Sequence, residues 1–267
     1  MIGGTGVPTG LVVVLAATVG LFVGSFLNVV VYRVPLGLSV VKPRSACPQC
    51  HTPIGALDNV PVLSWLLLGG KCRHCRHPIS PRYPLVELGN GVLWLVDALR
   101  VGVHPILPAV LISTSVLFAL ALIDADTMTL PRTLVYWGLG LTFVATLGAA
   151  LARHDLHALV RALLTGAAWF LLFFLINFAS PRALGFGDVR LAGLLGLVLG
   201  WWGLGEVLVG FFASNLLGAL VGGALIITKR RRRDQPLPYG VYLASGTILA
   251  LWFAPALLAH WHYWPQS

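Results

Sequence analysis

Long apolar segments dominate this chain and restrict it to one class of fold. Hydrophobic residues make up 57% of the sequence and charged residues only 10%, whereas soluble domains carry about 25% charged residues. A helix that crosses a bilayer needs about 20 mainly apolar residues. Eight stretches come close to this requirement: 9–31, 84–100, 107–125, 133–152, 158–179, 188–202, 204–228 and 239–261. We therefore expect an all-α polytopic membrane protein with about eight transmembrane helices.

The N-terminal stretch MIGGTGVPTG contains no lysine or arginine before the first apolar segment. It lacks the basic region of a cleavable signal peptide, so residues 9–31 are interpreted as a retained span. One long loop, of about fifty residues, separates this span from the second. The remaining predicted spans follow one another with short connections.

Basic residues lie mostly on one side of the predicted arrangement. If the first long loop is cytoplasmic, fifteen of the 18 lysines and arginines fall on the cytoplasmic side: Arg33, Lys42, Arg44, Lys71, Arg73, Arg76, Arg82, Arg132, Arg182, Arg190 and the run from Lys229 to Arg233. This asymmetry predicts an N-terminus outside and a cytoplasmic first loop. The net charge of +9 is better explained by topology and contact with anionic lipid than by nucleic acid, so we expect no nucleic-acid partner.

All four cysteines lie in the first loop, as the pairs Cys47/Cys50 and Cys72/Cys75 with 21 residues between them. Two C-x-x-C pairs at this separation are typical of a tetrahedral four-thiolate zinc site. Disulfides or buried thiols are the alternatives, but a cytoplasmic loop stays reduced. A closed site of four thiolates is structural. Three nearby histidines are expected outside the metal shell, although one of them replacing a cysteine is an alternative: His51, His74 and His77.

Three of the nine carboxylates lie at the ends of apolar segments, where an acid is a candidate functional group. Asp124 and Asp126 end the segment ALIDADTMTLP, and Asp188 stands in GFGDVRLAG. Residues two apart on a helix point in different directions, so a pair of carboxylates needs Asp188 and one of the other two. Two close carboxylates share a proton and can perform acid–base chemistry on one water.

Other features of these segments leave several interpretations open. Gly185 and Gly187, on either side of Phe186, permit backbone shapes closed to other residues and close approach of another chain, and so favour a cleft. The acids also have a purely structural interpretation, in which backbone groups or Arg190 satisfy them. Glu87 is either an acid at a helix start, favoured by the helix dipole, or a site residue.

Several blocks in this order resemble the type IV prepilin leader peptidases, which belong to the GxGD class of intramembrane aspartic proteases (peptidase family A24). The resemblance covers nearly the whole chain. It is carried by GSFLNVVVYRVP (24–35), the two cysteine pairs, PISPRYPLVEL (78–88), ALIDADTMTLP (121–131), GFGDVRLAG (185–193) and PYGVYLASG (238–246).

The resemblance implies two activities and the residues of one of them. One activity removes the basic leader of type IV prepilins or pseudopilins at the cytoplasmic face of the bacterial inner membrane. The other methylates the new N-terminus with S-adenosylmethionine. By position, Asp124 and Asp188 are the catalytic pair and Asp126 is secondary. Four further residues are expected to support the site or bind substrate: Gly185, Gly187, Asp126 and Glu87. No residue can be assigned to S-adenosylmethionine.

The family pattern also implies a division of the chain into three parts. These are a first transmembrane helix (1–33), a cytoplasmic zinc loop associated with methyl transfer (34–83) and a membrane-embedded aspartic peptidase (84–267). Arg132 stands where the family commonly has an acid or amide, and Arg190 where it usually has lysine. Recognition of the basic leader is expected to involve acids such as Glu87 or Asp58.

Two other functional classes compete with the peptidase. A transporter or ion channel would use Asp124 and Asp188 as a proton or cation relay, and a pilus-assembly interaction protein would keep the scaffold without activity. A relay predicts acids near mid-membrane and an internal repeat, whereas both acids are expected at one face and no clear repeat occurs. Nothing in the sequence indicates an oligomeric state.

Overall fold

The computed structural model describes residues 8–181, 184–229 and 237–259. This part of the chain is helical throughout, apart from two isolated β-bridges in the first long loop. The fold divides into two compact units, residues 1–103 and 104–267, and we describe each by itself. The all-helical expectation is confirmed for the described residues.

The first unit consists of two long helices and the loop between them. Helix α1 (Thr9–Arg33) packs against α3 (Arg82–Val101), and the loop contains a 3-10 turn (Leu57–Asn59) and the short helix α2 (Leu63–Leu67). The two long helices touch where α1 has glycine: a Cβ on Gly24 would lie 2.7 Å from the Cα of Glu87. The Asn90 side chain also donates to the Gly20 carbonyl at 2.8 Å. Small residues and a polar bond of this kind hold helices together inside a membrane.

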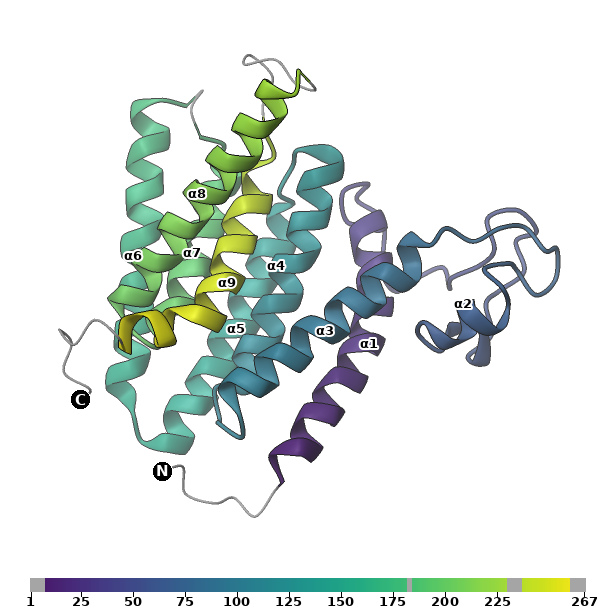
Figure 1. Cartoon of the computed structure of the whole chain (residues 1–267), viewed down its shortest axis with the longest axis horizontal. Helices are drawn as coiled ribbons and strands as arrows, with labels where there is room; N and C mark the ends of the chain where they lie inside the picture. Colours follow the sequence, from purple (N-terminus) through teal and green to yellow (C-terminus); the bar gives the residue numbers. More distant parts are fainter. Residues whose placement is uncertain (1–7, 182–183, 230–236, 260–267) are drawn as a thin grey trace. The chain divides into compact units, whose positions relative to one another are not determined.

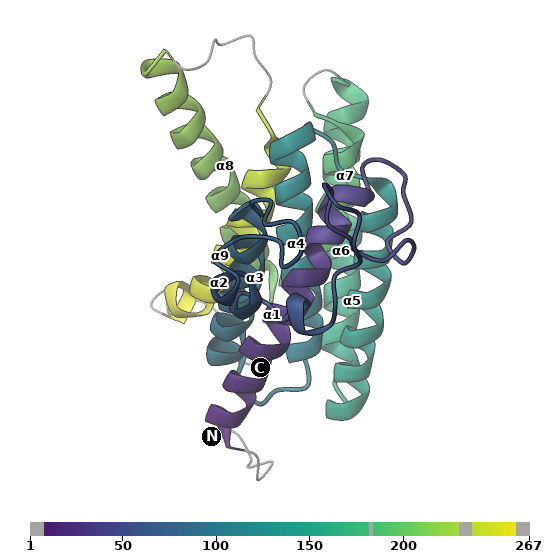
Figure 2. The same cartoon turned by 90° about the vertical axis from the view of Figure 1, so that its right-hand side faces the viewer.

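The second unit is a bundle of six helices (Figure 1). In chain order they are α4 (Leu107–Thr127), α5 (Arg132–Arg153), α6 (Leu156–Ala179), α7 (Phe186–Gly200), α8 (Leu204–Ile227) and α9 (Tyr239–Ala259). Helix α6 packs along α7, α8 packs along α9, and α4 contacts both α5 and α9. Figure 2 shows that α8 diverges from its neighbours towards its C-terminal end.

Helix α7 is the core of this bundle. Most of its residues from Asp188 onward are buried, as expected of a helix that is apolar on all sides. Glycines allow α6 to approach it closely, because a Cβ on Gly196 would lie 2.6 Å from the Thr165 carbonyl oxygen. The same helix carries Asp188 in its first turn, so the best-packed element of the unit positions this candidate catalytic acid.

Six described helices are long and apolar enough to cross a membrane: α1, α4, α5, α6, α8 and α9. The other two predicted spans do not meet this description. Helix α3 has 20 residues but contains four charged side chains, and α7 has 15 residues, about 22 Å of helix against a hydrocarbon core of about 30 Å. The chain is therefore an integral membrane protein with six candidate spans, and the count of eight is not confirmed. Arg182, the run Arg230–Arg233 and Asp234 lie outside the described residues.

Candidate active site

Asp124 lies in the last turn of α4, and its side chain is only 5% exposed. The C-terminal end of a helix is unfavourable for a negative charge. The N-terminal end of α9 compensates, because the Val241 backbone N–H donates to Asp124 Oδ2 at 3.2 Å. The first N–H groups of a helix have no partners within it and are free to bind an acid. Helix α9 thus fixes the position of this carboxylate.

Asp188 lies in the first turn of α7, where the helix dipole favours an acid, and is 9% exposed. Its backbone N–H donates to the Gly185 carbonyl at 3.0 Å. The Asp188 and Asp124 carboxylates are near enough for their charges to repel each other. Among the described residues, Arg190 forms no ion pair with either acid. The structural alternative is therefore not supported for Arg190, whereas a backbone group, the Val241 N–H, does bind Asp124.

Leu130, just after α4, packs between the starting turns of α7 and α9. A Cβ on Gly187 would lie 3.0 Å from Leu130 Cβ, and a Cβ on Gly240 would lie 3.0 Å from Leu130 Cδ2 and 2.9 Å from Asp124 Oδ2. Glycine at both positions therefore allows Leu130 to pack closely against the first turns of α7 and α9. The site is made from the end of one helix and the beginnings of two others.

The expectation that Gly185 and Gly187 use backbone shapes closed to other residues is wrong. Gly185 has φ −71° and ψ 146°, an extended conformation open to any residue, and Gly187 is helical. The other part of the expectation, close approach of another segment, holds for Gly187. A Cβ on Gly185 would meet only the Asp188 carboxylate, at 3.2 Å.

Sequence reasoning did not single out the beginning of α9. Tyr239 lies within electrostatic reach of Asp188, and its hydroxyl donates to Asn215 Oδ1 at 3.3 Å. With Gly240 and Val241 it forms the PYGV stretch that opens α9. The available signal was the segment PYGVYLASG, which carried part of the family resemblance without an assigned role.

Asp126 is exposed and lies apart from the buried Asp124 side chain. This agrees with the argument that residues two apart on a helix face different surroundings. Asp124, at the C-terminal end of α4, contacts α9 through the bond described above. The structure brings Asp124 and Asp188 together and leaves Asp126 outside the pair.

The four cysteines of the first unit form one cluster. Their Sγ atoms all lie within 4.8 Å of one another, with Cys47 and Cys75 3.7 Å apart and Cys50 and Cys72 4.0 Å apart. All four thiols are free, so the disulfide alternative is wrong for this structure. A tetrahedron of thiolates about 2.3 Å from zinc has edges of about 3.8 Å. The cluster can therefore hold a metal ion, and its geometry fits zinc.

The two cysteine pairs have the same local structure. His51 N–H donates to the Cys47 carbonyl at 2.9 Å, and Arg76 N–H donates to the Cys72 carbonyl at 3.1 Å. Both His51 and Arg76 have positive φ, 56° and 59°. Hydrogen bonding between Cys50 and the side chain and backbone of Thr52 also lowers the pKa of Cys50 to about 6, which favours the thiolate that a metal requires.

Two acids form hydrogen bonds with residues of the loop that carries this cluster. Asp58 accepts bonds from Arg73 at 2.6–3.0 Å, and the guanidinium holds the pKa of Asp58 below its usual value. Glu87, in the second turn of α3, accepts the Val62 N–H at 2.7 Å and is buried. Glu87 is not in the first turn of α3, so the interpretation as an acid at the helix start is wrong.

Comparisons with known proteins show which family this chain belongs to. Residues 111–223 match the family described as "Type IV leader peptidase family", and residues 18–101 match the "Bacterial Peptidase A24 N-terminal domain". A protein named prepilin leader peptidase/N-methyltransferase from Aeromonas hydrophila is 38% identical over 261 residues, covering 87% of this chain and 88% of its own. The chain belongs to the type IV leader peptidase family.

Distant bacteria carry relatives with the same printed name. The Bacillus subtilis protein is 34% identical over 240 residues, which are 90% of this chain and 94% of its own length. The Burkholderia pseudomallei protein is 34% identical over 280 residues, 92% and 87% of the two chains. No solved structure matches the chain significantly.

Membership of this family makes the chain an enzyme, a peptidase of family A24, and decides against the transporter and the inactive scaffold. The N-terminal match contains the four cysteines and Glu87, and the leader peptidase match contains Asp124 and Asp188. Val241 lies beyond both matched ranges, although its N–H binds Asp124. The surroundings of Asp124 therefore extend past the segment by which the family is detected.

Proposed function

We propose that this enzyme removes the basic leader peptide of type IV prepilins or pseudopilins with Asp124 and Asp188 as its catalytic pair. The observation that carries the proposal is the meeting of two buried carboxylates at one junction, with Asp124 oriented by α9. Buried acids on adjoining helices of a membrane protein are costly and indicate function.

The two carboxylates divide the chemistry of peptide hydrolysis between them. Two close negative charges disfavour each other, so the pair holds one proton. The ionised carboxylate takes a proton from water, which attacks the scissile carbonyl, and the other carboxyl group donates a hydrogen bond or proton to the carbonyl oxygen. The proton taken from water then passes from the carboxyl group to the leaving amine, and no covalent intermediate forms.

Methylation of the new N-terminus with S-adenosylmethionine is the second part of the proposal. It rests on the printed names of the relatives, all prepilin leader peptidase/N-methyltransferase. The cysteine cluster, with zinc bound by Cys47, Cys50, Cys72 and Cys75, would keep the loop folded, since a closed four-thiolate site supplies folding free energy. We assign the loop (34–83) to this activity and residues 84–267 to the peptidase.

We also propose the bacterial inner membrane as the location, with the N-terminus outside and both activities at the cytoplasmic face. The distribution of lysine and arginine supports this orientation. The partners of Glu87 and Asp58, the Val62 N–H and Arg73, favour a structural role for both acids over binding of the basic leader.

Cleavage of a prepilin by membranes containing each variant tests the catalytic pair. Asp124→Asn and Asp188→Asn keep the shape of the side chain but remove its charge, and each is expected to lower the cleavage rate by about 10³-fold, within the range of acid–base catalysis. The matched change Asp126→Asn, at an exposed carboxylate two residues away, is expected to stay within about threefold of wild type. Normal processing by either of the first two variants would overturn the proposal.

A further inference from the structure

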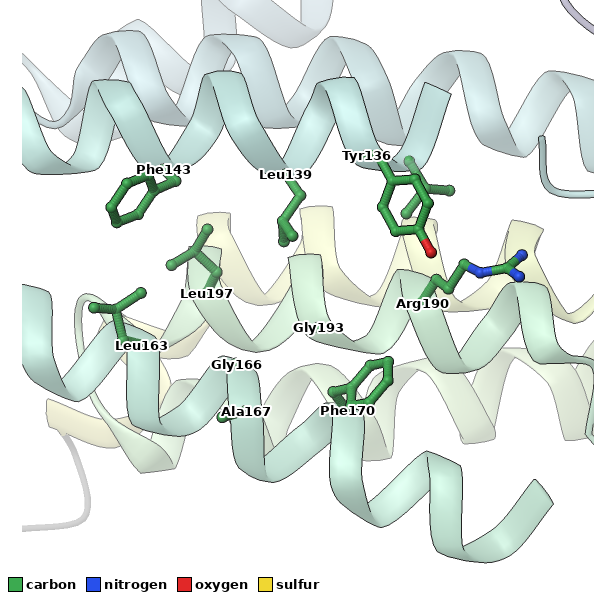
Figure 3. A pocket seen from close by; sticks show the side chains of 11 residues that line it. Tyr136, Leu139, Phe143, Leu163, Gly166, Ala167, Phe170, Arg190, Gly193 and Leu197 are labelled. Carbon is green, nitrogen blue, oxygen red and sulfur yellow. The ribbon is translucent and has the colours of Figure 1, made fainter. Parts of the chain in front are cut away.

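Three helices of the second unit enclose an apolar groove away from the aspartate pair. It has a volume of about 360 Å³ and lies between α5, α6 and α7. Figure 3 shows Phe143 and Leu163 near one end of the groove and Arg190 at the other, with Gly166 and Gly193 between them. Every lining side chain except those of Arg190 and Tyr136 is apolar.

The groove opens on a surface that faces lipid. Helices α5 and α6 are both candidate membrane spans, and the lining residues Tyr136, Leu163 and Phe170 are 55%, 42% and 39% exposed. Apolar surface of this kind on a membrane span is covered by acyl chains.

Arg190 gives the groove one charged end. Its guanidinium carbon lies 4.5 Å from the centre of the Phe186 ring and 5.9 Å from that of Tyr136, so both rings are within cation–π distance. Its Nε is buried and has no hydrogen-bond partner among the described residues. Stacking uses the faces of a guanidinium and leaves the in-plane N–H groups for an acceptor. A buried donor without an acceptor is costly, so a ligand is expected.

We propose that the groove binds one membrane lipid with an anionic phosphate headgroup, such as phosphatidylglycerol. The phosphate accepts hydrogen bonds from Arg190, for which a planar guanidinium is well suited, and one acyl chain lies along the groove towards Phe143. Arg190 is two residues from Asp188 in α7, so the headgroup lies at the membrane depth of the aspartates. Lipid binding here is independent of the proteolytic role of Asp188.

The groove follows α7 from Arg190 to Leu197, about 10 Å of helix. One acyl chain can lie along this length of the apolar lining.

Lipid titration of the purified, delipidated full-length protein, followed by native mass spectrometry, tests the proposal. Phosphatidylglycerol and phosphatidylcholine with the same acyl chains are added separately. We expect wild type to take up one phosphatidylglycerol at concentrations where phosphatidylcholine binds about tenfold less. Equal binding of the two lipids would show that Arg190 does not select a headgroup and would overturn the proposal.

Two pairs of variants locate the lipid. Arg190→Gln is expected to weaken phosphatidylglycerol binding about fivefold to tenfold, whereas Arg132→Gln, which removes the same charge from an exposed position on α5, leaves it within about twofold. Ala167→Phe fills the groove and is expected to weaken binding at least about tenfold. Ala168→Phe, at the exposed neighbour that does not line the groove, is its control.

The two variants of each pair must differ in their affinity for phosphatidylglycerol for the proposal to hold. If Arg190→Gln binds lipid like Arg132→Gln, the headgroup lies elsewhere. If Ala167→Phe binds like Ala168→Phe, the acyl chain does not occupy the groove. Melting temperatures of the four variants in the same detergent show whether each is folded, and a folded variant with the wrong affinity overturns the assignment.

Discussion

The position of the Asp124 carboxylate depends on the absence of a side chain at Gly240. The glycine lies in the first turn of α9 beside Val241, whose N–H binds the carboxylate. A Cβ at position 240 would approach Asp124 Oδ2 to 2.9 Å and Leu130 Cδ2 to 3.0 Å. These contacts are tighter than ordinary packing, so either the carboxylate or the end of α4 would have to move.

Gly240→Ala is therefore expected to lower the kcat/KM for prepilin cleavage by about ten- to a hundredfold, because a displacement below 1 Å is enough to misalign a reacting group. Gly140→Ala on α5 is the control, since a Cβ there meets nothing within 4 Å. Cleavage kinetics and melting temperature are measured for both. Full activity of a folded Gly240→Ala enzyme would contradict the role given to this turn.

Helices α8 and α9 approach each other most closely at Gly246. Gly246 is buried, and a Cβ at this position would lie 2.6 Å from the Cα of Ser214 on α8. The Ser214 hydroxyl donates to the Gly210 carbonyl at 2.7 Å and also reaches the Leu243 carbonyl. Contact between backbones at a small residue is how helices associate in a membrane.

Replacing Gly246 by alanine should destabilise the protein by about 1–3 kcal/mol through overpacking, which outweighs the gain of about 1 kcal/mol in helix propensity. Gly223→Ala, on α8 where a Cβ meets nothing within 4 Å, receives the same gain without the clash. We expect a lower melting temperature in detergent for Gly246→Ala and an equal or higher one for Gly223→Ala. The opposite order would show that α8 and α9 do not pack through Gly246.

At the scale of the whole molecule, the cysteine cluster and the aspartate pair lie in different compact units. The cysteine cluster and Glu87 belong to residues 1–103, and the aspartate pair belongs to residues 104–267. Each unit has its own close helix packing, through Gly24 in the first and Gly196 in the second. Loss of one site is therefore not expected to remove the other.

Cys72→Ser is expected to lower the zinc content, measured by elemental analysis, below the value of about one ion per chain expected for wild type. It is also expected to abolish methylation of a pre-cleaved substrate, because a structural zinc site folds its own loop. Prepilin cleavage is expected to persist. Asp124→Asn should show the reverse pattern. His74→Ala, in the same turn but outside the cysteine cluster, should keep both activities. Full methylation by zinc-free Cys72→Ser would separate the loop from methyl transfer.

A feature could be predicted from the sequence when the residues that form it are close together along the chain. The cysteine cluster was predictable because C-x-x-C spacing places two thiols on one turn. The span count was not confirmed because α3 carries charges and α7 is short, and α7 is covered by neighbouring helices whose positions no local pattern reveals. The backbone freedom expected of Gly185 was wrong because its conformation is an ordinary extended one.

By itself, the sequence determined that this is a helical membrane protein with four cysteines suited to one metal ion and with acids at the ends of its spans. Hydrophobicity, spacing and charge are properties of neighbouring residues, so they are readable along the chain. Only the tertiary structure decided that the first turn of α9 orients Asp124, across 117 positions of sequence, and that Arg190 faces a groove instead of the aspartates. Those contacts depend on how helices pack, and packing is set by the whole bundle at once.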